Sequence, residues 1–218
     1  MALFKWFRAA MVALALIATP AVAEPVPEPH PVKLVGTYDG RQMEMAAGLE
    51  LSADGRFRYG LSYGALDETS AGTWRFDGTA VRLTSDPVTP PQFVLLGQAK
   101  GKNGQLTIAL DLPKGLSRQY FDALVTFTDG TTKLQQFAEE GLTLAIAKDQ
   151  QVQSVRLVLQ VYELAGEPVA VANPAGATLQ FRFEPHDIGK VAFTDMPLRI
   201  EDGALLLEHL GRTVRFRK

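Results

Sequence analysis

Residues 49–59 have the sequence LELSADGRFRY, and this stretch decides the fold class because apolar residues alternate on both sides of an Asp-Gly pair. Asp-Gly between alternating segments is a strong signal for a β-hairpin. Residues paired across a hairpin point to one face, so the loop must place apolar side chains opposite each other. A three-residue loop, Ala53-Asp54-Gly55, pairs Leu51 with Phe57. We therefore predict a bulged hairpin in which Gly55 has a positive φ.

Further Asp-Gly pairs along the chain predict more turns of this kind. They stand at positions 39–40, 77–78, 129–130 and 202–203. At the last three of these, a two-residue type I′ loop brings apolar residues to the same face. The predicted partners are Trp74 with Val81, Val125 with Leu134, and Leu198 with Leu207.

Alternating apolar residues continue through most of the remaining chain, for example at Leu106, Ile108 and Leu110. Helix signals are sparse. The pattern predicts an all-β fold, an antiparallel meander that forms a small barrel or sandwich and possibly two β-domains. Residues 65–72, ALDETSAG, have little apolar periodicity and are expected to form a loop.

The domain division is predicted from a proline-rich break at residues 86–91, DPVTPP. We expect a first domain over residues 33–100 and a second, β-sandwich-like region over residues 101–218. In an alternative division, residues 177–218 return to complete the first sheet, and the middle of the chain is an insertion. The alternation of apolar residues is compatible with both divisions.

Residues 1–23 have the features of a secretory signal peptide. Lys5 and Arg8 precede a short apolar run, and Ala21-Val22-Ala23 fits a cleavage site. The run is too short to span a bilayer. The proline-rich residues 24–32 predict an extended tether. We therefore expect an exported protein, periplasmic or secreted.

The composition excludes several classes of protein. The chain has no cysteine, which excludes disulfides, thiolate metal sites and a lipid-modified cysteine. The formal net charge of −2 becomes more negative when Lys5 and Arg8 are lost with the signal, which argues against a nucleic-acid partner. No apolar run after the signal is long enough to cross a membrane. We expect no cofactor and no metal site.

Residues 60–64, GLSYG, fit the G-x-S-x-G pattern of a hydrolase nucleophile elbow. That elbow needs a strained turn at the serine and a helix directly after it. Here Ser62 alternates with apolar neighbours, so it is expected on the solvent-facing side of a strand. The adjacent Asp67 and Glu68 are interpreted as solvated or capping loop residues, and the histidines at positions 30, 186 and 209 as surface residues. We therefore expect no catalytic residue and no enzyme activity.

Several aromatic residues fall on the inward faces of the predicted first domain. Core packing is the ordinary explanation of such a set. Alternatively, the aromatic side chains line a cup whose tyrosine hydroxyls orient a small apolar ligand. The candidate ligand-binding residues are Tyr38, Tyr59, Tyr63 and Trp74.

A basic strip ends the chain, with Arg212, Arg215 and Arg217 as candidates for contact with an anionic envelope component. The other interpretation is an edge strand whose outward charges prevent aggregation.

A set of short motifs recurs between residues 36 and 83. They are Gly36-Thr37-Tyr38, Leu49-Glu50-Leu51, Asp54-Gly55-Arg56-Phe57, Gly72-Thr73-Trp74, Asp77-Gly78 and Val81-Arg82-Leu83. This pattern resembles small bacterial lipocalin-like envelope domains, such as the N-terminal barrel of copper-responsive outer-membrane lipoproteins. The resemblance implies a small antiparallel barrel or half-barrel. The cysteines of those lipoproteins are absent, so lipid anchoring is not implied.

These observations predict a non-catalytic exported β-protein that binds a small apolar ligand or serves envelope maintenance. The alternative is an interaction module that docks on another envelope component through β-edges or the basic C-terminal strip. A third hypothesis, a serine hydrolase with Ser62 as nucleophile, lacks the structural context that the elbow needs.

Overall fold

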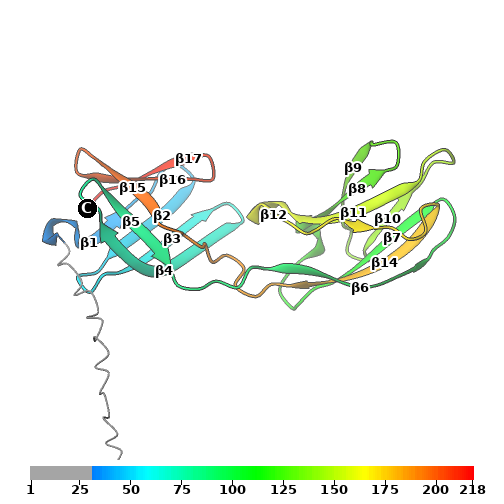
Figure 1. Ribbon diagram of the computed structural model, residues 1–218, viewed down its shortest axis with the longest axis horizontal. Coiled ribbons are helices and arrows are strands. Elements are labelled where there is room, and N and C mark those ends of the chain that lie inside the picture. The colour runs from blue at the N-terminus through cyan, green and yellow to red at the C-terminus, as the bar shows by residue number, and fades with distance from the viewer. Residues whose placement is uncertain (1–30) are drawn as a thin grey trace, which may run out of the picture.

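The computed structural model describes residues 31–218. Of the described residues, 59% lie in strands and 4% in helices, which confirms the predicted all-β fold class. The strands form two lobes connected by two linkers (Figure 1). The predicted signal peptide (1–23) and nearly all of the predicted tether (24–32) lie outside the described residues. Within the described part of the chain, no helix is long and apolar enough to cross a membrane.

The first lobe is a nearly closed antiparallel barrel of eight strands in the order β1-β2-β3-β4-β5-β15-β16-β17. The 3-10 turn η1 (Val32–Leu34) precedes β1 (Gly36–Asp39), β2 (Met45–Leu51), β3 (Arg56–Tyr63), β4 (Leu66–Phe76), β5 (Ala80–Ser85), β15 (Met196–Glu201), β16 (Ala204–His209) and β17 (Arg212–Phe216). Asp39 and Arg217 exchange backbone hydrogen bonds of 2.7 and 2.9 Å. This bridge joins the first strand to the end of the last and confirms the predicted barrel.

The second lobe is inserted between β5 and β15, and we call it the insert. It contains β6 (Gln92–Lys100), β7 (Gln105–Asp111), η2 (Arg118–Tyr120), β8 (Phe121–Phe127), β9 (Thr132–Gln136), β10 (Leu142–Ala145), β11 (Val152–Leu159), η3 (Gln160–Tyr162), β12 (Leu164–Ala165), β13 (Val169–Ala170) and β14 (Gly176–Glu184). One sheet has the order β10-β7-β14-β6, and the other has the order β12-β11-β8-β9 with β13 also on β11. β14 runs parallel to β7, whereas its other partner, β6, is antiparallel.

Strand pairing shows which residues belong to each lobe. β6, which ends at Lys100, pairs with β14 and therefore lies in the insert. The chain returns to the barrel at β15, where Met196 pairs with Leu83 of β5. The barrel is thus built from both ends of the described chain, with residues 92–184 forming the sheets of the insert.

Two hairpins have the register that matching of apolar faces predicts. Leu51 pairs with Phe57, and Gly55 has a φ of 79°. Leu198 pairs with Leu207 around a turn in which Asp202 and Gly203 both have positive φ. Positive φ at both loop residues is what a type I′ turn requires.

The predicted register at Asp77-Gly78 is wrong. Trp74 pairs with Leu83 instead of its predicted partner, because the loop lies one residue further along the chain. The Asp77 carboxylate accepts hydrogen bonds from the amides of Thr79 and Ala80 at 2.9 and 2.8 Å. An aspartate that binds the following amides in this way forms an Asx turn, and this turn determines where the loop lies.

The predicted register at Asp129-Gly130 is also wrong. Phe127 N donates to Thr131 O at 2.9 Å, which leaves a three-residue loop in which Gly130 has a φ of 84°. Leu134 then pairs with Leu124. Because Leu124 lies on the outer face of β8, Leu134 also points outward and is 51% exposed.

Residues 66–76 form one long strand, β4, which corrects the loop predicted over 65–72. The turn before β4 is short, since Tyr63 pairs directly with Leu66 across Gly64 and Ala65. Every residue from Leu66 to Thr73 has a backbone partner on β3, and this pairing outweighs the weak apolar periodicity. The inward positions of β4 therefore include Glu68, which is buried.

The linker that returns from the insert enters the barrel. Phe193 N donates to Ser85 Oγ at 2.8 Å. The Phe193 side chain is 2% exposed, and its ring centre lies 5.2 Å from that of Tyr59. We call residues 190–193 the strap, because this segment holds Phe193 inside the barrel.

Each lobe has a hydrophobic core of its own. The barrel core contains buried residues from Leu34 to Leu83 and from Phe193 to Phe216. The core of the insert contains buried residues from Leu106 to Phe183. The two cores share no buried residue, so the lobes are packed as separate units.

Candidate functional site

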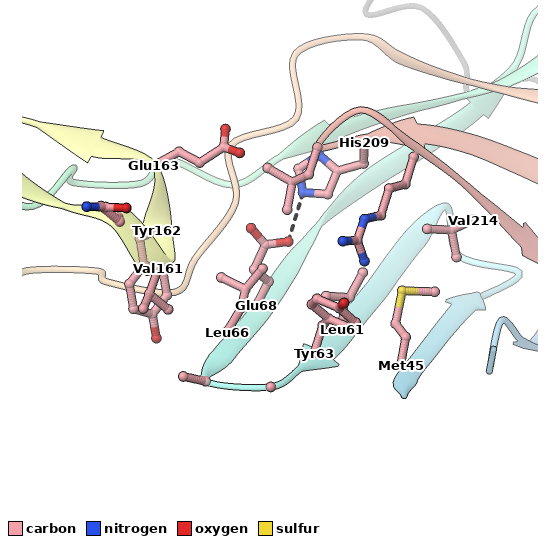
Figure 2. A pocket seen from close by; sticks show the side chains of 15 residues that line it. Met45, Leu61, Tyr63, Leu66, Glu68, Val161, Tyr162, Glu163, His209 and Val214 are labelled. Atoms are coloured by element: carbon pink, nitrogen blue, oxygen red, sulfur yellow. Dashed lines mark hydrogen bonds and ion pairs between the residues drawn. The ribbon is translucent and has the colours of Figure 1, made fainter. Parts of the chain in front are cut away.

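A pocket of about 360 Å³ lies at the end of the barrel that faces the insert (Figure 2). The barrel contributes the start of β2 and the hairpins β3–β4 and β16–β17, and the insert contributes η3. Apolar side chains that line it include Met45, Leu61, Leu66, Val161, Leu210 and Val214. A concave, mostly apolar site with a few polar groups is typical of small-molecule binding.

A carboxylate–histidine pair lies in the wall of this pocket. Glu68 of β4 and His209 of β16 reach toward each other, and the His209 Nε2–H donates to Glu68 Oε2 at 2.8 Å (Figure 2). The two side chains are only 9% and 13% exposed respectively. Because both side chains are nearly buried, water competes little for this hydrogen bond.

Tyr59 lies beside this pair in the interior of the barrel. Its ring packs edge-on against the ring of His209, with centres 6.3 Å apart. Its hydroxyl is buried and has no hydrogen-bond partner among the described residues. Burial raises the pKa of Tyr59 well above its usual value, and the negative charge of Glu68 adds to the effect. Tyr59 is therefore a neutral phenol at physiological pH.

Arg212 supplies the cationic group of the pocket. Its guanidinium carbon lies 4.2 Å from the ring centre of Tyr63, which is a cation–π contact. The turn before it, Leu210-Gly211, has positive φ at both residues, as a type I′ turn requires. This turn places Arg212 at the start of β17, beside the pocket.

The four aromatic candidates do not form one cup. Tyr38, Tyr59 and Trp74 are 2%, 4% and 2% exposed and belong to the barrel core. The Tyr38 hydroxyl donates to the carbonyl of Leu34 at 2.7 Å. Trp74 Nε1–H donates to the carbonyl of Ser52 at 2.9 Å. Tyr63 alone among the four lines the pocket described above.

The three arginine candidates lie on two faces of β17. Val214 and Phe216 are buried, so Arg212 shares their inward parity, whereas Arg215 and Arg217 alternate with them. Arg215 lies 3.4 Å from Glu201 and 3.5 Å from Asp202. The structure therefore brings Arg212 to the pocket and places Arg215 and Arg217 on the opposite face.

Ser62 lies on the outer face of β3. Its hydroxyl donates to Asp67 Oδ1 at 2.5 Å, and this contact is exposed. Glu68 and His209 lie on the inner side of the wall. Among the described residues, no hydrogen bond joins Ser62 to a histidine, and no group of histidine and carboxylate side chains could hold a metal ion.

The inward orientation of Glu68 and His209 was missed by the sequence reasoning. The signal for both is strand parity. Glu68 stands an even number of residues from buried Trp74, and His209 stands two residues from buried Leu207. Strand alternation places such residues on the same face. Interpretation of residues 65–72 as a loop removed this signal for Glu68.

Comparison of the chain with protein-family models, with curated proteins and with solved structures finds no match.

Proposed function

We propose that the protein is a non-catalytic binding protein that takes a small, mostly apolar molecule into the pocket between the barrel and η3. The observation that carries this proposal is the convergence of apolar walls with a few fixed polar groups in one concavity of about 360 Å³. Small eight-stranded barrels commonly hold one small ligand at or near their mouths.

The chemistry of the pocket favours binding over catalysis. A carboxylate–histidine pair performs nucleophilic catalysis when the histidine activates a hydroxyl or thiol. Among the described residues that line the pocket, there is no serine, threonine or cysteine, and no hydrogen bond joins His209 to the hydroxyl of Tyr63 or Tyr162. Glu68 and His209 instead provide a fixed polar contact for a ligand.

The proposed location is the periplasm or the extracellular space. Support comes from the signal-like residues 1–23 and from the resemblance of residues 36–83 to lipocalin-like envelope domains. In that location, the protein would bind an apolar molecule that is poorly soluble in the surrounding water. Envelope maintenance is the corresponding role.

The test is titration of the purified protein with the neutral fluorescent probe N-phenyl-1-naphthylamine. We expect saturable binding of one probe per chain, because a pocket of about 360 Å³ has room for one molecule of this size. Ala65→Trp, at the exposed rim of the pocket, should abolish this binding by filling the space. The matched control is Ala99→Trp, an exposed residue of β6 that does not line the pocket.

Two results would contradict the proposed function. One is the absence of saturable probe binding to the wild-type protein. The other is equal binding by the Ala65→Trp and Ala99→Trp variants, which would place the probe elsewhere. Circular dichroism of both variants checks that each keeps its β-structure.

A further inference from the structure

Arg212 places a positive charge beside the mostly apolar walls of the pocket. β17 turns Val214 and Phe216 into the barrel core, and Arg212 continues the same parity at the open end. Arg212 itself is exposed, and it lines the pocket where this row of residues leaves the barrel core. Strand positions of this parity elsewhere in β17 are apolar.

The guanidinium of Arg212 contacts an aromatic ring, and its N–H donors have no hydrogen-bond acceptor among the described residues. It lies over the face of Tyr63, 4.2 Å from the ring centre. This cation–π contact restrains the position of the guanidinium and leaves its N–H donors free to bind a ligand. Among the described residues, no hydrogen bond or ion pair engages these donors.

Neighbouring arginines of the barrel have protein partners. Arg75 pairs with Asp195 at 2.7 Å, and Arg82 pairs with Asp77 at 2.7 Å. In the pocket, the carboxylate of Glu68 already accepts a hydrogen bond from His209 at 2.8 Å. Glu163 is the other carboxylate of the lining, and it makes no ion pair with Arg212 in the described part of the chain.

We propose that Arg212 binds the carboxylate of the ligand, so that the pocket takes an apolar monocarboxylate such as a medium-chain fatty acid. This inference rests on the proposed binding function and names the chemical class of the ligand. The planar fork of a guanidinium matches a carboxylate with two parallel hydrogen bonds. The apolar body of the ligand packs against Leu61, Leu66 and Val214.

A single negative charge fits this pocket better than a double one. Among the described residues that line the pocket, Arg212 is the one arginine, and the carboxylate of Glu163 adds negative charge to the lining. A phosphate dianion would therefore meet repulsion from Glu163 and attraction from one guanidinium. A carboxylate needs only the one cation.

The test compares three ligands that share a chain and differ in the head group: decanoate, decanol and decylammonium. Each is titrated against the protein with bound N-phenyl-1-naphthylamine, and displacement gives the affinity. We expect decanoate to bind about 10- to 100-fold more tightly than decanol, since hydrogen bonds to charged groups contribute that much. Arg212→Gln should remove this preference, so that decanoate and decanol bind with similar affinity.

Arg217→Gln is the matched control, because Arg217 directly follows the other end of the same strand and has the opposite parity to buried Phe216. It should keep the preference for decanoate. Arg212→Lys keeps the charge without the planar fork and should restore the preference in part.

Three outcomes would overturn the inference. They are equal affinity for decanoate and decanol, a decanoate preference that survives Arg212→Gln, and tightest binding of decylammonium, which would assign the head group to Glu68 and Glu163. Each of these outcomes is measured by displacement of the neutral probe, so it applies only to a protein that binds that probe. Failure of the probe itself to bind would instead contradict the proposed function.

Discussion

Gly72 occupies an inward position of β4, close to the backbone of β5 and to the ring of Phe57. A Cβ atom there would lie 2.6 Å from the Cα of Ser85 and 2.9 Å from a ring carbon of Phe57. We therefore expect Gly72→Ala to lower the free energy of unfolding by about 1 to 3 kcal/mol, as overpacking of a core does. Urea denaturation measures this change.

Gly60 of β3 is the matched control for Gly72. A Cβ atom there would meet only the carbonyl oxygen of Glu68, at 3.8 Å. Gly60→Ala should leave stability within about 0.5 kcal/mol of wild type. Equal destabilisation by both substitutions would show that loss of glycine, and not the close approach at Gly72, is responsible.

Asp77 makes stability depend on pH. Hydrogen bonds from the Ala80 amide and from Arg82 lead the contacts that lower the pKa of its carboxyl well below the usual range. A lowered folded-state pKa stabilises fully above the unfolded pKa of about 4, and this contribution is lost as pH falls toward the folded value. The urea midpoint of wild type should therefore exceed that of Asp77→Asn at pH 7 by more than at pH 3.

Asp77→Ala separates the charge from the turn geometry. It removes the acceptor for the Thr79 and Ala80 amides as well as the charge, so it should lower the midpoint at every pH. A gap between wild type and Asp77→Asn that stays constant from pH 7 to pH 2 would exclude a role for the lowered pKa.

The strap is an element of the barrel although it belongs to a linker. Phe193 packs against Phe57, Tyr59 and His209, with ring centres 6.3, 5.2 and 5.8 Å away. Phe193→Ala should lower the free energy of unfolding of the barrel by about 3 to 5 kcal/mol. Hydrogen exchange should report the loss at barrel amides and spare those of the insert.

Phe183→Ala is the matched change in the insert, because Phe183 is 1% exposed in the other core. Its effect on hydrogen exchange should fall on the insert. If Phe193→Ala also raised exchange throughout the insert, the two cores would be one cooperative unit.

Two hairpin registers could be predicted by placing apolar residues opposite each other across an Asp-Gly turn. Leu51 with Phe57 and Leu198 with Leu207 are such cases. At Asp77, the loop moved by one residue in each strand, and this shift keeps every side chain on its face. Alternation cannot detect such a shift, since it carries information only about parity. The Asx turn of Asp77 supplied the missing constraint.

The site could be predicted only in part. The parity of His209 with Leu207 indicates that it faces inward. Its contact with Glu68 depends on barrel closure, because β4 and β16 are separated by β5 and β15 in the sheet. That strand order arises because the insert separates β5 from β15 in the chain. No local sequence pattern predicts that β15 lies beside β5 in the sheet. The pocket wall from η3 depends on the position of the insert in the same way.

At the scale of the whole molecule, the barrel and the insert meet through two linkers that lie side by side. Thr89 and Asp187 exchange hydrogen bonds of 2.9 and 3.1 Å across them. We expect that replacing residues 90–186 with a short Asn-Gly turn leaves a folded barrel that retains the strap. Circular dichroism and a single cooperative urea transition would demonstrate this.

The shortened protein also tests the pocket. It lacks Val161 and Tyr162 of the insert, which line the pocket. Its affinity for the neutral probe should therefore fall, while β-structure remains. A shortened chain that does not fold would show that the barrel depends on the insert for stability.

The pairing of Met196 with Leu83 sets the order in which the chain can fold. Five barrel strands are synthesised first, and they stay an open sheet until the insert has been made. If the insert folds first, only the linkers remain as flexible chain, and this reduces the entropic cost of closing the barrel by roughly 1.5 kcal/mol. Pulse-labelling hydrogen exchange during refolding should find β11 amides protected before those of β15, and the reverse order would exclude this route.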